Sequence, residues 1–180
     1  MRFLYFIFLL LFFCVNACVA PLSERHSIIT KIHIDFEDST VSIKKLEGDA
    51  REGKYFSRAD EEDQFTGTIV FTIPDSLLGE NIRIISDCYL RCGEKYAGHC
   101  FVAAVQKKDS LFYWSAIINA DDFNAESNEW THVTDSTQVP SDKTSVKGSE
   151  IRLFGFNGGA RSYMDIDNIN ITLKKIEFRQ

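Results

Sequence analysis

The sequence predicts an all-β fold, an antiparallel two-sheet jelly-roll sandwich that follows an N-terminal signal segment. From residue 28 onward, apolar and polar residues alternate with a period of two, as they do in strands with one buried face. Turn residues separate these strands, and no window of a dozen residues shows the 3.6-residue period of a helix. About nine short strands without crossover helices favour a sandwich over an α/β fold.

The strands follow one another at near-regular spacing. In residues 32–36, large apolar residues alternate with polar ones such as His33 and Asp35. In residues 69–73, Ile69, Phe71 and Ile73 alternate with Val70 and Thr72. Further strands are predicted at 82–92, 100–107, 111–119, 130–134, 150–157 and 169–178. Between them, Gly, Pro, Asn and Asp predict turns at 74–75, 78–80, 107–110, 119–128, 140–143 and 157–159.

The last segment changes its inward face partway along. Met164 and Ile166 share one parity, whereas Ile169 and Ile171 share the other. A bulge or corner at residues 167–168 accounts for this change, and Asp167 is expected to cap it.

The chain begins with a leader, residues 1–20, that resembles a secretory signal peptide. A short basic start precedes thirteen apolar residues, fewer than the roughly 20 that span a bilayer. Cleavage before Cys18 at a lipobox-like site leaves a lipidated cysteine, whereas cleavage after Ala20 releases a secreted protein. Both alternatives predict an extracytoplasmic protein, an outer-surface lipoprotein or a secreted one, which meets the membrane only through a lipid anchor on Cys18.

The remaining chain has the size of one domain and is acidic. Residues 21–29 form a short tail, and residues 30–178 form the sandwich domain. Residues 21–180 carry 19 Lys and Arg against 26 Asp and Glu, a formal net charge of −7, because the leader removes only Arg2. This charge argues against a nucleic-acid partner, which needs a positive surface.

Three cysteines follow the leader, and an oxidising compartment permits one disulfide among them. Cys92 and Cys100 flank a short loop, which makes them the most economical pair. Cys88 has the same strand parity as Cys92 and competes for the same partner. Cysteine and histidine are residue types that bind zinc, so these cysteines and His99 are also candidate zinc ligands. The paired Cys-x-x-Cys spacing of structural zinc sites is missing, however.

The strand at 82–92 has the best polar and aromatic row in the chain. If Ile84 and Leu90 point inward, then Arg83, Tyr89 and Arg91 point outward, together with Asp87. Tyr89 between two guanidinium groups is a candidate ligand-binding platform, with Tyr96 of the following loop beside it. The alternative is an exposed strand face with cross-strand ion pairs. Both tryptophans, Trp114 and Trp130, are expected to pack within the fold.

Several short motifs occur in an order that resembles galactose-binding-like jelly-roll domains, which include many carbohydrate-binding modules and β-sandwich domains of bacterial surface proteins. The resemblance covers most of residues 30–178. Its motifs are Phe-Glu at 36–37, Gly-Lys-Tyr at 53–55, Phe-Gly-Phe-Asn at 154–157, Tyr-Met-Asp-Ile-Asp-Asn-Ile at 163–169, and the aromatic segments 111–114 and 129–130.

The resemblance implies a non-catalytic binding module of the cell surface or secreted space, with carbohydrate as its partner. The alternative is a structural or protein-interaction envelope lipoprotein that binds a surface protein and has no sugar site. The resemblance also implies a structural calcium held by Glu37 and Asp165, with the carbonyls of Asp38 and Lys54 completing the coordination shell. Without a metal, these carboxylates would form a solvated acidic strand end.

Enzyme motifs do not occur. The chain has neither a Gly-x-Ser-x-Gly elbow nor the spaced carboxylates of sandwich-fold glycosidases, of which residues 165–167 supply a fragment. The protein is therefore expected not to be an enzyme.

Overall fold

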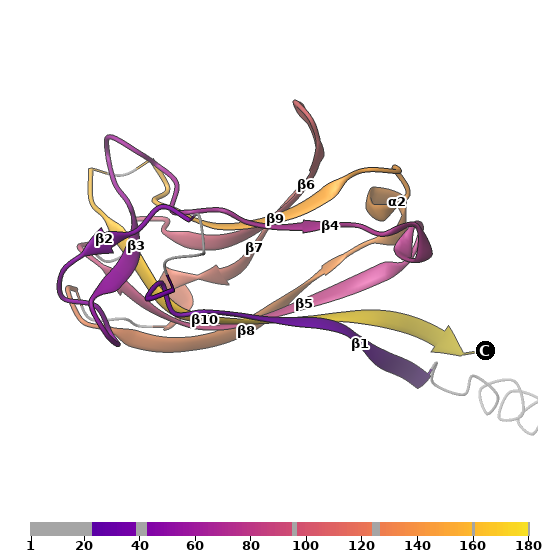
Figure 1. The fold of residues 1–180 in the computed structure, drawn as a ribbon, viewed down its shortest axis with the longest axis horizontal. Coiled ribbons are helices and arrows are strands. Elements are labelled where there is room, and N and C mark those ends of the chain that lie inside the picture. Colours follow the sequence, from indigo (N-terminus) through magenta and orange to yellow (C-terminus); the bar gives the residue numbers. More distant parts are fainter. Residues whose placement is uncertain (1–22, 39–42, 95–96, 124–126, 160, 180) are drawn as a thin grey trace, which may run out of the picture.

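The computed structural model describes residues 23–38, 43–94, 97–123, 127–159 and 161–179, which form two antiparallel sheets packed face to face (Figure 1). The predicted sandwich is therefore confirmed. The six-stranded sheet contains β1 (Ser23–Ile34), β2 (Leu46–Glu47), β3 (Tyr55–Ala59), β5 (Asn81–Cys92), β8 (Thr131–Val139) and β10 (Met164–Arg179). The four-stranded sheet contains β4 (Ile69–Thr72), β6 (Cys100–Lys107), β7 (Ser110–Asn119) and β9 (Glu150–Phe156), in the order β4-β9-β6-β7.

Among the described residues, three short helical turns connect the strands: η1 (Asp75–Leu77), η2 (Ala120–Phe123) and α2 (Ser141–Thr144). Two of them follow directly on Pro74 and Pro140, whose fixed φ suits the start of a helical turn. In the described part of the chain, no helix has the length and apolarity that a membrane span requires.

The long strand β10 organises the six-stranded sheet. It pairs with β5 on one side along most of its length. On the other side its first residues pair with β3 and its later residues with β1, so that Ser23 lies opposite Arg179. The segment 23–29, expected to be a tail, is therefore part of a strand, because the extended β10 supplies it with backbone partners as far as Arg179.

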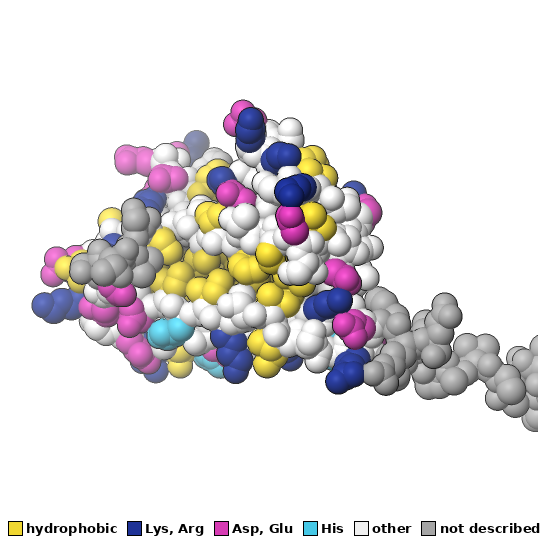
Figure 2. All heavy atoms as spheres, turned by 45° about the vertical axis from the view of Figure 1, so that its right-hand side comes forward, with side chains coloured by type: hydrophobic (Ala, Val, Ile, Leu, Met, Phe, Trp, Pro, Cys, Tyr) yellow, Lys and Arg dark blue, Asp and Glu magenta, His cyan; other side chains and the backbone are white. Residues whose placement is uncertain are grey.

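The core lies between the sheets, on the faces that the alternation predicts. Ile84 and Leu90 of β5 face Ile151 and Leu153 of β9 in one cluster of buried side chains, and all four are at most 1% exposed. Complete burial of such a side chain contributes about 1.5–3 kcal/mol to folding. Figure 2 shows a band of apolar side chains at the level between the two layers of Figure 1, with charged groups above and below it.

The predicted bulge lies where the inward face of β10 changes. The register shifts between Asp167 and Asn170, and Asn168 adopts a positive φ of 47°. The Asp167 carboxylate accepts a hydrogen bond from the backbone N–H of Asn168 at 2.7 Å, and its other oxygen accepts from Arg51 and Glu52 at 2.8 and 3.1 Å. Burial of Asp167 raises its pKa, although these three N–H groups oppose the shift.

The expected disulfide between Cys92 and Cys100 is absent. Both residues, like Cys88, are buried free thiols. Cys92 belongs to the core between the sheets. Cys100 instead packs with Val102 and Phe154 in a separate apolar cluster. Two cysteines that flank a short loop therefore need not form a disulfide. Here the loop joins two different sheets, and the two side chains pack in different clusters.

Candidate functional site

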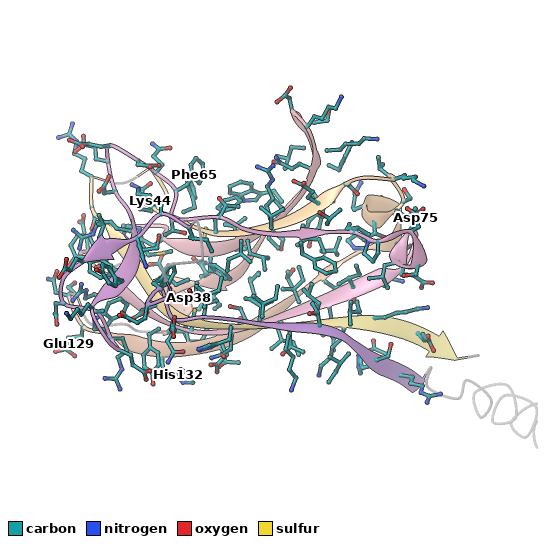
Figure 3. The ribbon with its side chains drawn as sticks, in the orientation of Figure 1. Asp38, Lys44, Phe65, Asp75, Glu129 and His132 are labelled. Carbon is teal, nitrogen blue, oxygen red and sulfur yellow. The ribbon has the colours of Figure 1, made fainter. Side chains whose placement is uncertain are left out.

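The outer face of the four-stranded sheet is apolar where the outer face of a sandwich is usually polar. Three large apolar side chains are exposed there around one groove: Phe65 is 40% exposed, Leu111 56% and Trp114 45%. Phe65 precedes β4 (Figure 3), and the other two belong to β7. An exposed apolar cluster of this kind indicates a binding surface.

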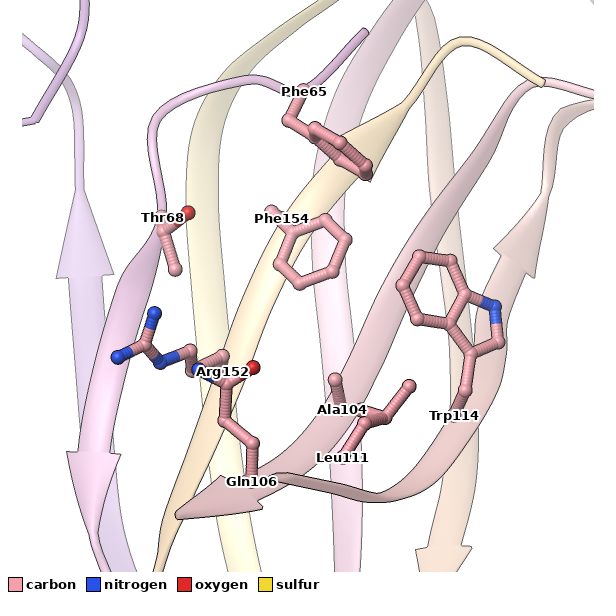
Figure 4. A pocket seen from close by; sticks show the side chains of 8 residues that line it. All are labelled: Phe65, Thr68, Ala104, Gln106, Leu111, Trp114, Arg152 and Phe154. Carbon is pink, nitrogen blue, oxygen red and sulfur yellow. The ribbon is translucent and has the colours of Figure 1, made fainter. Parts of the chain in front are cut away.

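The groove has a volume of about 320 Å³ and is called the aromatic groove below (Figure 4). Its eight lining residues come from β6, β7, β9 and the segment before β4: Phe65, Thr68, Ala104, Gln106, Leu111, Trp114, Arg152 and Phe154. Ala104 and Phe154 are buried and form its floor, whereas the exposed rings of Phe65 and Trp114 stand beside them.

The rings of the groove hold one another in place. The Trp114 ring lies 5.3 Å from that of Phe154 and 5.8 Å from that of Phe156. Phe65 stacks on Phe156 with a centroid distance of 5.4 Å, and an isolated β-bridge joins the backbones of these two residues. Such ring pairs contribute about 0.5–1.5 kcal/mol beyond their burial, so the apolar wall is formed before a ligand arrives.

Polar groups line the other end of the groove. The Arg152 guanidinium donates to the Glu150 carboxylate, with Nη2 at 3.0 Å and Nε at 3.2 Å from Oε2. With the Gln106 amide turned so that its oxygen faces Arg152, that oxygen also accepts from Nε and Nη1 at 3.0 and 3.1 Å. Planar groups held in fixed positions suit hydrogen bonding to a polar ligand.

Strand register explains why the groove forms here. On β6, Ala104 lies opposite Trp114 of β7 on one side and Arg152 of β9 on the other. Its small side chain leaves space on the outer face between its larger neighbours. The register between β6 and β7 also shifts twice, at Phe101/Val102 and at Val105/Gln106.

Trp114 was expected to pack within the fold, but its ring is almost half exposed. The sequence does not distinguish the two positions, because the preceding residues 111–113 are large and apolar or aromatic on both faces of the strand. Trp130 is half-buried and does pack: its Nε1 donates to the Asp49 carbonyl at 3.2 Å, and its ring lies 4.5 Å from the Arg91 guanidinium.

The residues predicted as a ligand platform on β5 share the outward face, but each has its own partners. Arg83 pairs with Glu24 at 3.7 Å. Tyr89 lies between the Arg51 guanidinium, 4.8 Å from its ring, and the His132 ring at 5.1 Å. Arg91 is buried. Tyr96 lies outside the described residues, as do the leader and Cys18.

Arg91 belongs to a buried ion network centred on Asp165. The Asp165 carboxylate is 0% exposed and accepts from Arg58 Nε at 2.6 Å and from Arg91 Nη2 at 2.9 Å. Arg91 Nη1 also donates to Asp49 at 2.8 Å. The strong hydrogen bonds to Asp165 raise the pKa of Arg58.

The residues expected to hold calcium do not fit it as a group. Both oxygens of Asp165 accept hydrogen bonds from guanidinium groups, whose charge would repel a cation. Glu37 lies apart from that network, and its Oε1 accepts from the backbone N–H groups of Lys54 and Tyr55 at 2.7 and 2.8 Å. The Asp38 carbonyl accepts from the Lys45 ammonium at 3.4 Å.

His99, considered above as a zinc ligand, is fully buried and directly precedes β6. Neither ring nitrogen lies in a hydrogen bond of good geometry. Burial lowers the pKa of His99, while a backbone hydrogen bond at Asn157 and then the charges of Asp121 and Glu94 oppose that shift. Among the residues that the structure describes, no three His, Cys, Asp or Glu side chains converge on a metal position.

No protein-family model matches the chain, and no curated protein matches it. Among solved structures, it is similar to a xylan-binding domain of carbohydrate-binding module family 22 from Paenibacillus barcinonensis, with 13% identity and a TM-score of 0.47 over 84% of this chain and 97% of that one. It is also similar to a family 6 carbohydrate-binding module of LamC from Zobellia galactanivorans, with 14% identity and a TM-score of 0.39 over 79% and 99%.

A third similar structure is a Stig cyclase from Fischerella sp. TAU, with 13% identity and a TM-score of 0.42 over 90% of this chain and 94% of that one. All three similarities are at low identity, and neither a ligand nor a residue role is transferred from them.

Proposed function

We propose that the protein is an extracytoplasmic, non-catalytic module that binds glycan in the aromatic groove. The observation that carries this proposal is the position of Trp114, almost half exposed over the buried Phe154 on the outer face of a sheet. The proposed extracytoplasmic location of the protein is based on the leader sequence, with either a lipid anchor on Cys18 or plain secretion.

The chemistry of the groove suits a sugar chain. A pyranose has an apolar C–H face and polar hydroxyl edges, so it needs a ring to pack on and planar polar groups to bond with. Trp114 and Phe65 supply exposed rings, and Gln106 and Arg152 supply amide and guanidinium groups at the other end. A purely apolar ligand would leave these polar groups without a new partner.

A second candidate function is protein binding along the edge of the same sheet. The strand β7 is an edge strand in the order β4-β9-β6-β7, and it carries the exposed Leu111 and Trp114. An edge strand has free backbone groups that a partner's strand can pair with. This alternative predicts binding to a surface protein and none to glycans.

The test is a glycan-array screen of the mature protein, with Trp114→Ala as the site variant. We expect selective binding that Trp114→Ala lowers at least about tenfold, because stacking on one ring is worth roughly 1.4 kcal/mol or more. Tyr89→Ala is the matched control, since it removes a half-buried ring from the outer face of the other sheet. Loss of binding in Tyr89→Ala alone would move the site to β5, and absence of binding by folded protein would favour the protein-binding alternative.

A further inference from the structure

The charge in the aromatic groove belongs to one residue and is already neutralised. Of the eight lining residues, Arg152 alone carries a charge. Its guanidinium is held by the Glu150 carboxylate two residues earlier on β9, and the two side chains are 37% and 32% exposed. Residues two apart in a strand point to the same face, so the carboxylate accompanies the guanidinium on the outer face of the sheet.

The groove therefore offers hydrogen-bond donors without a net charge. The Gln106 oxygen engages Nε and Nη1 of Arg152, and Glu150 engages Nε and Nη2. A ligand carboxylate at this end would compete with Glu150 for the Arg152 guanidinium. The negative charge of Glu150 would also repel that carboxylate. A hydroxyl group is neutral, so Glu150 does not repel it. It bonds to the remaining N–H groups of Arg152 and to Gln106 without displacing the Glu150 carboxylate.

The two lysines that follow the groove residue Gln106 in the sequence, Lys107 and Lys108, do not line the groove. Lys107, at the end of β6, directs its ammonium to the Lys147 carbonyl at 2.8 Å. Lys108 is an exposed residue of the turn between β6 and β7, where water and salt screen its charge. Arg152 is thus the group that would have to recognise an acidic sugar.

We infer that Glu150 makes the groove selective for neutral glycans by holding the Arg152 guanidinium in an ion pair, so that uronate-containing chains are rejected. This inference rests on the proposed function. Glu150 acts through Arg152 and is a specificity-determining residue that need not touch the sugar. Removing its charge while keeping its shape should turn the same groove toward acidic chains.

The test compares two pairs of probes that differ at C6 alone: mannohexaose with the β-1,4-mannuronate hexamer, and cellohexaose with the β-1,4-glucuronate hexamer. Affinities are measured by calorimetry in low salt for the full mature protein and for Glu150→Gln. We expect Glu150→Gln to bind the uronate hexamers about fivefold or more tightly than the unmodified protein does, because a freed guanidinium forms charge-assisted hydrogen bonds. Affinity for the neutral hexamers should change by less than about twofold.

Three controls make the result specific. Glu24→Gln has the same change of charge at a carboxylate on β1 of the other sheet, 3.7 Å from Arg83, and should leave all affinities unchanged. The double variant Glu150→Gln/Arg152→Gln should lose the gain for uronates. The gain should also shrink in 0.5 M salt, as a charge-dependent effect must.

The outcomes separate the two proposals. Binding in the groove, abolished by Trp114→Ala, with no gain for uronates in Glu150→Gln overturns the inference and leaves the proposed function standing. Preferential binding of uronates by the unmodified protein also overturns the inference. Failure of the folded protein and both variants to bind any of these hexamers or any glycan of the array overturns the proposed function and the inference together.

Discussion

The rings of Trp114 on β7 and Phe154 on β9 lie 5.3 Å apart although another strand, β6, separates them in the sheet. The contact crosses β6 beside Ala104, which lies opposite Trp114 and is 1% exposed. A larger side chain at that position would stand between the rings. The shape of the groove therefore depends on a small residue in its floor.

Ala104→Leu is expected to lower glycan affinity at least about tenfold while the fold is retained, because the added methyl groups occupy the space in which a sugar would lie. Ala116→Leu is the matched control: it makes the same change on the outer face of β7, where Ala116 is exposed and does not line the groove. Calorimetry with the best glycan of the array measures both variants. Equal affinities for the two would contradict this role of Ala104.

Asp165→Asn should strongly destabilise the protein. It leaves the buried Arg91 and the neighbouring Arg58 without their shared counter-charge, and breaking a buried ion pair in this way costs about 3–5 kcal/mol. Urea unfolding followed by circular dichroism measures the loss. Asp75→Asn removes a carboxylate from an exposed pair with Lys147 and should leave the midpoint unchanged. Similar midpoints for both variants would show that the Asp165 network adds little.

Stability should decrease as the pH falls below about 6.5, in part because of His99. Burial lowers the pKa of His99 in the folded protein below the ordinary value of 6.5, so the unfolded chain binds its proton first. The stability present above pH 6.5 is then lost progressively as the pH falls toward the folded pKa. Asp167, whose pKa is raised, contributes in the opposite sense: its stabilisation is present at low pH and is lost as the pH rises.

His99→Gln isolates the contribution of the histidine, since Asp167 and the other described histidines remain in the variant. Melting temperatures measured from pH 7.5 to 5.5 should fall less steeply for His99→Gln than for the unmodified protein. Parallel curves would mean that His99 is already solvated, or already paired, in solution.

The three cysteines of the sandwich should resist thiol reagents in the native state. Burial raises the pKa of Cys88 and Cys92 to about 12 and that of Cys100 to about 11, so thiolates are scarce at pH 8. Labelling with iodoacetamide followed by peptide mass mapping should find all three unmodified in native protein and all three modified in guanidinium. A linked Cys92–Cys100 peptide would contradict the free thiols of the structure.

The alternation of apolar residues was sufficient to predict the sandwich because most strands bury one face. Strand 100–107 was predicted at its observed bounds, and the change of parity in the last segment located the bulge after Asp167. The pattern did not identify β3 as a separate strand, since its five residues pair with distant β10 for only three positions.

The groove could not be predicted in the same way. Every residue from Cys100 to Val105 is buried, so β6 shows no difference between its inner and outer faces. A strand that is apolar on both faces is equally consistent with a central core strand and with a strand under a binding surface. The outward parity of Arg91 was predicted, but its burial depends on Asp49 and Trp130, which are distant in sequence.

The pairing of Ser23 with Arg179 has a mechanical consequence. Because β1 and β10 are antiparallel and these two residues lie opposite each other, a force that pulls residues 23 and 179 apart acts at one end of the ladder, along the direction of its hydrogen bonds. The bonds then open one after another, as in a zipper, instead of resisting together in shear. Under tension β1 would peel away first, while the groove on the opposite sheet is still intact.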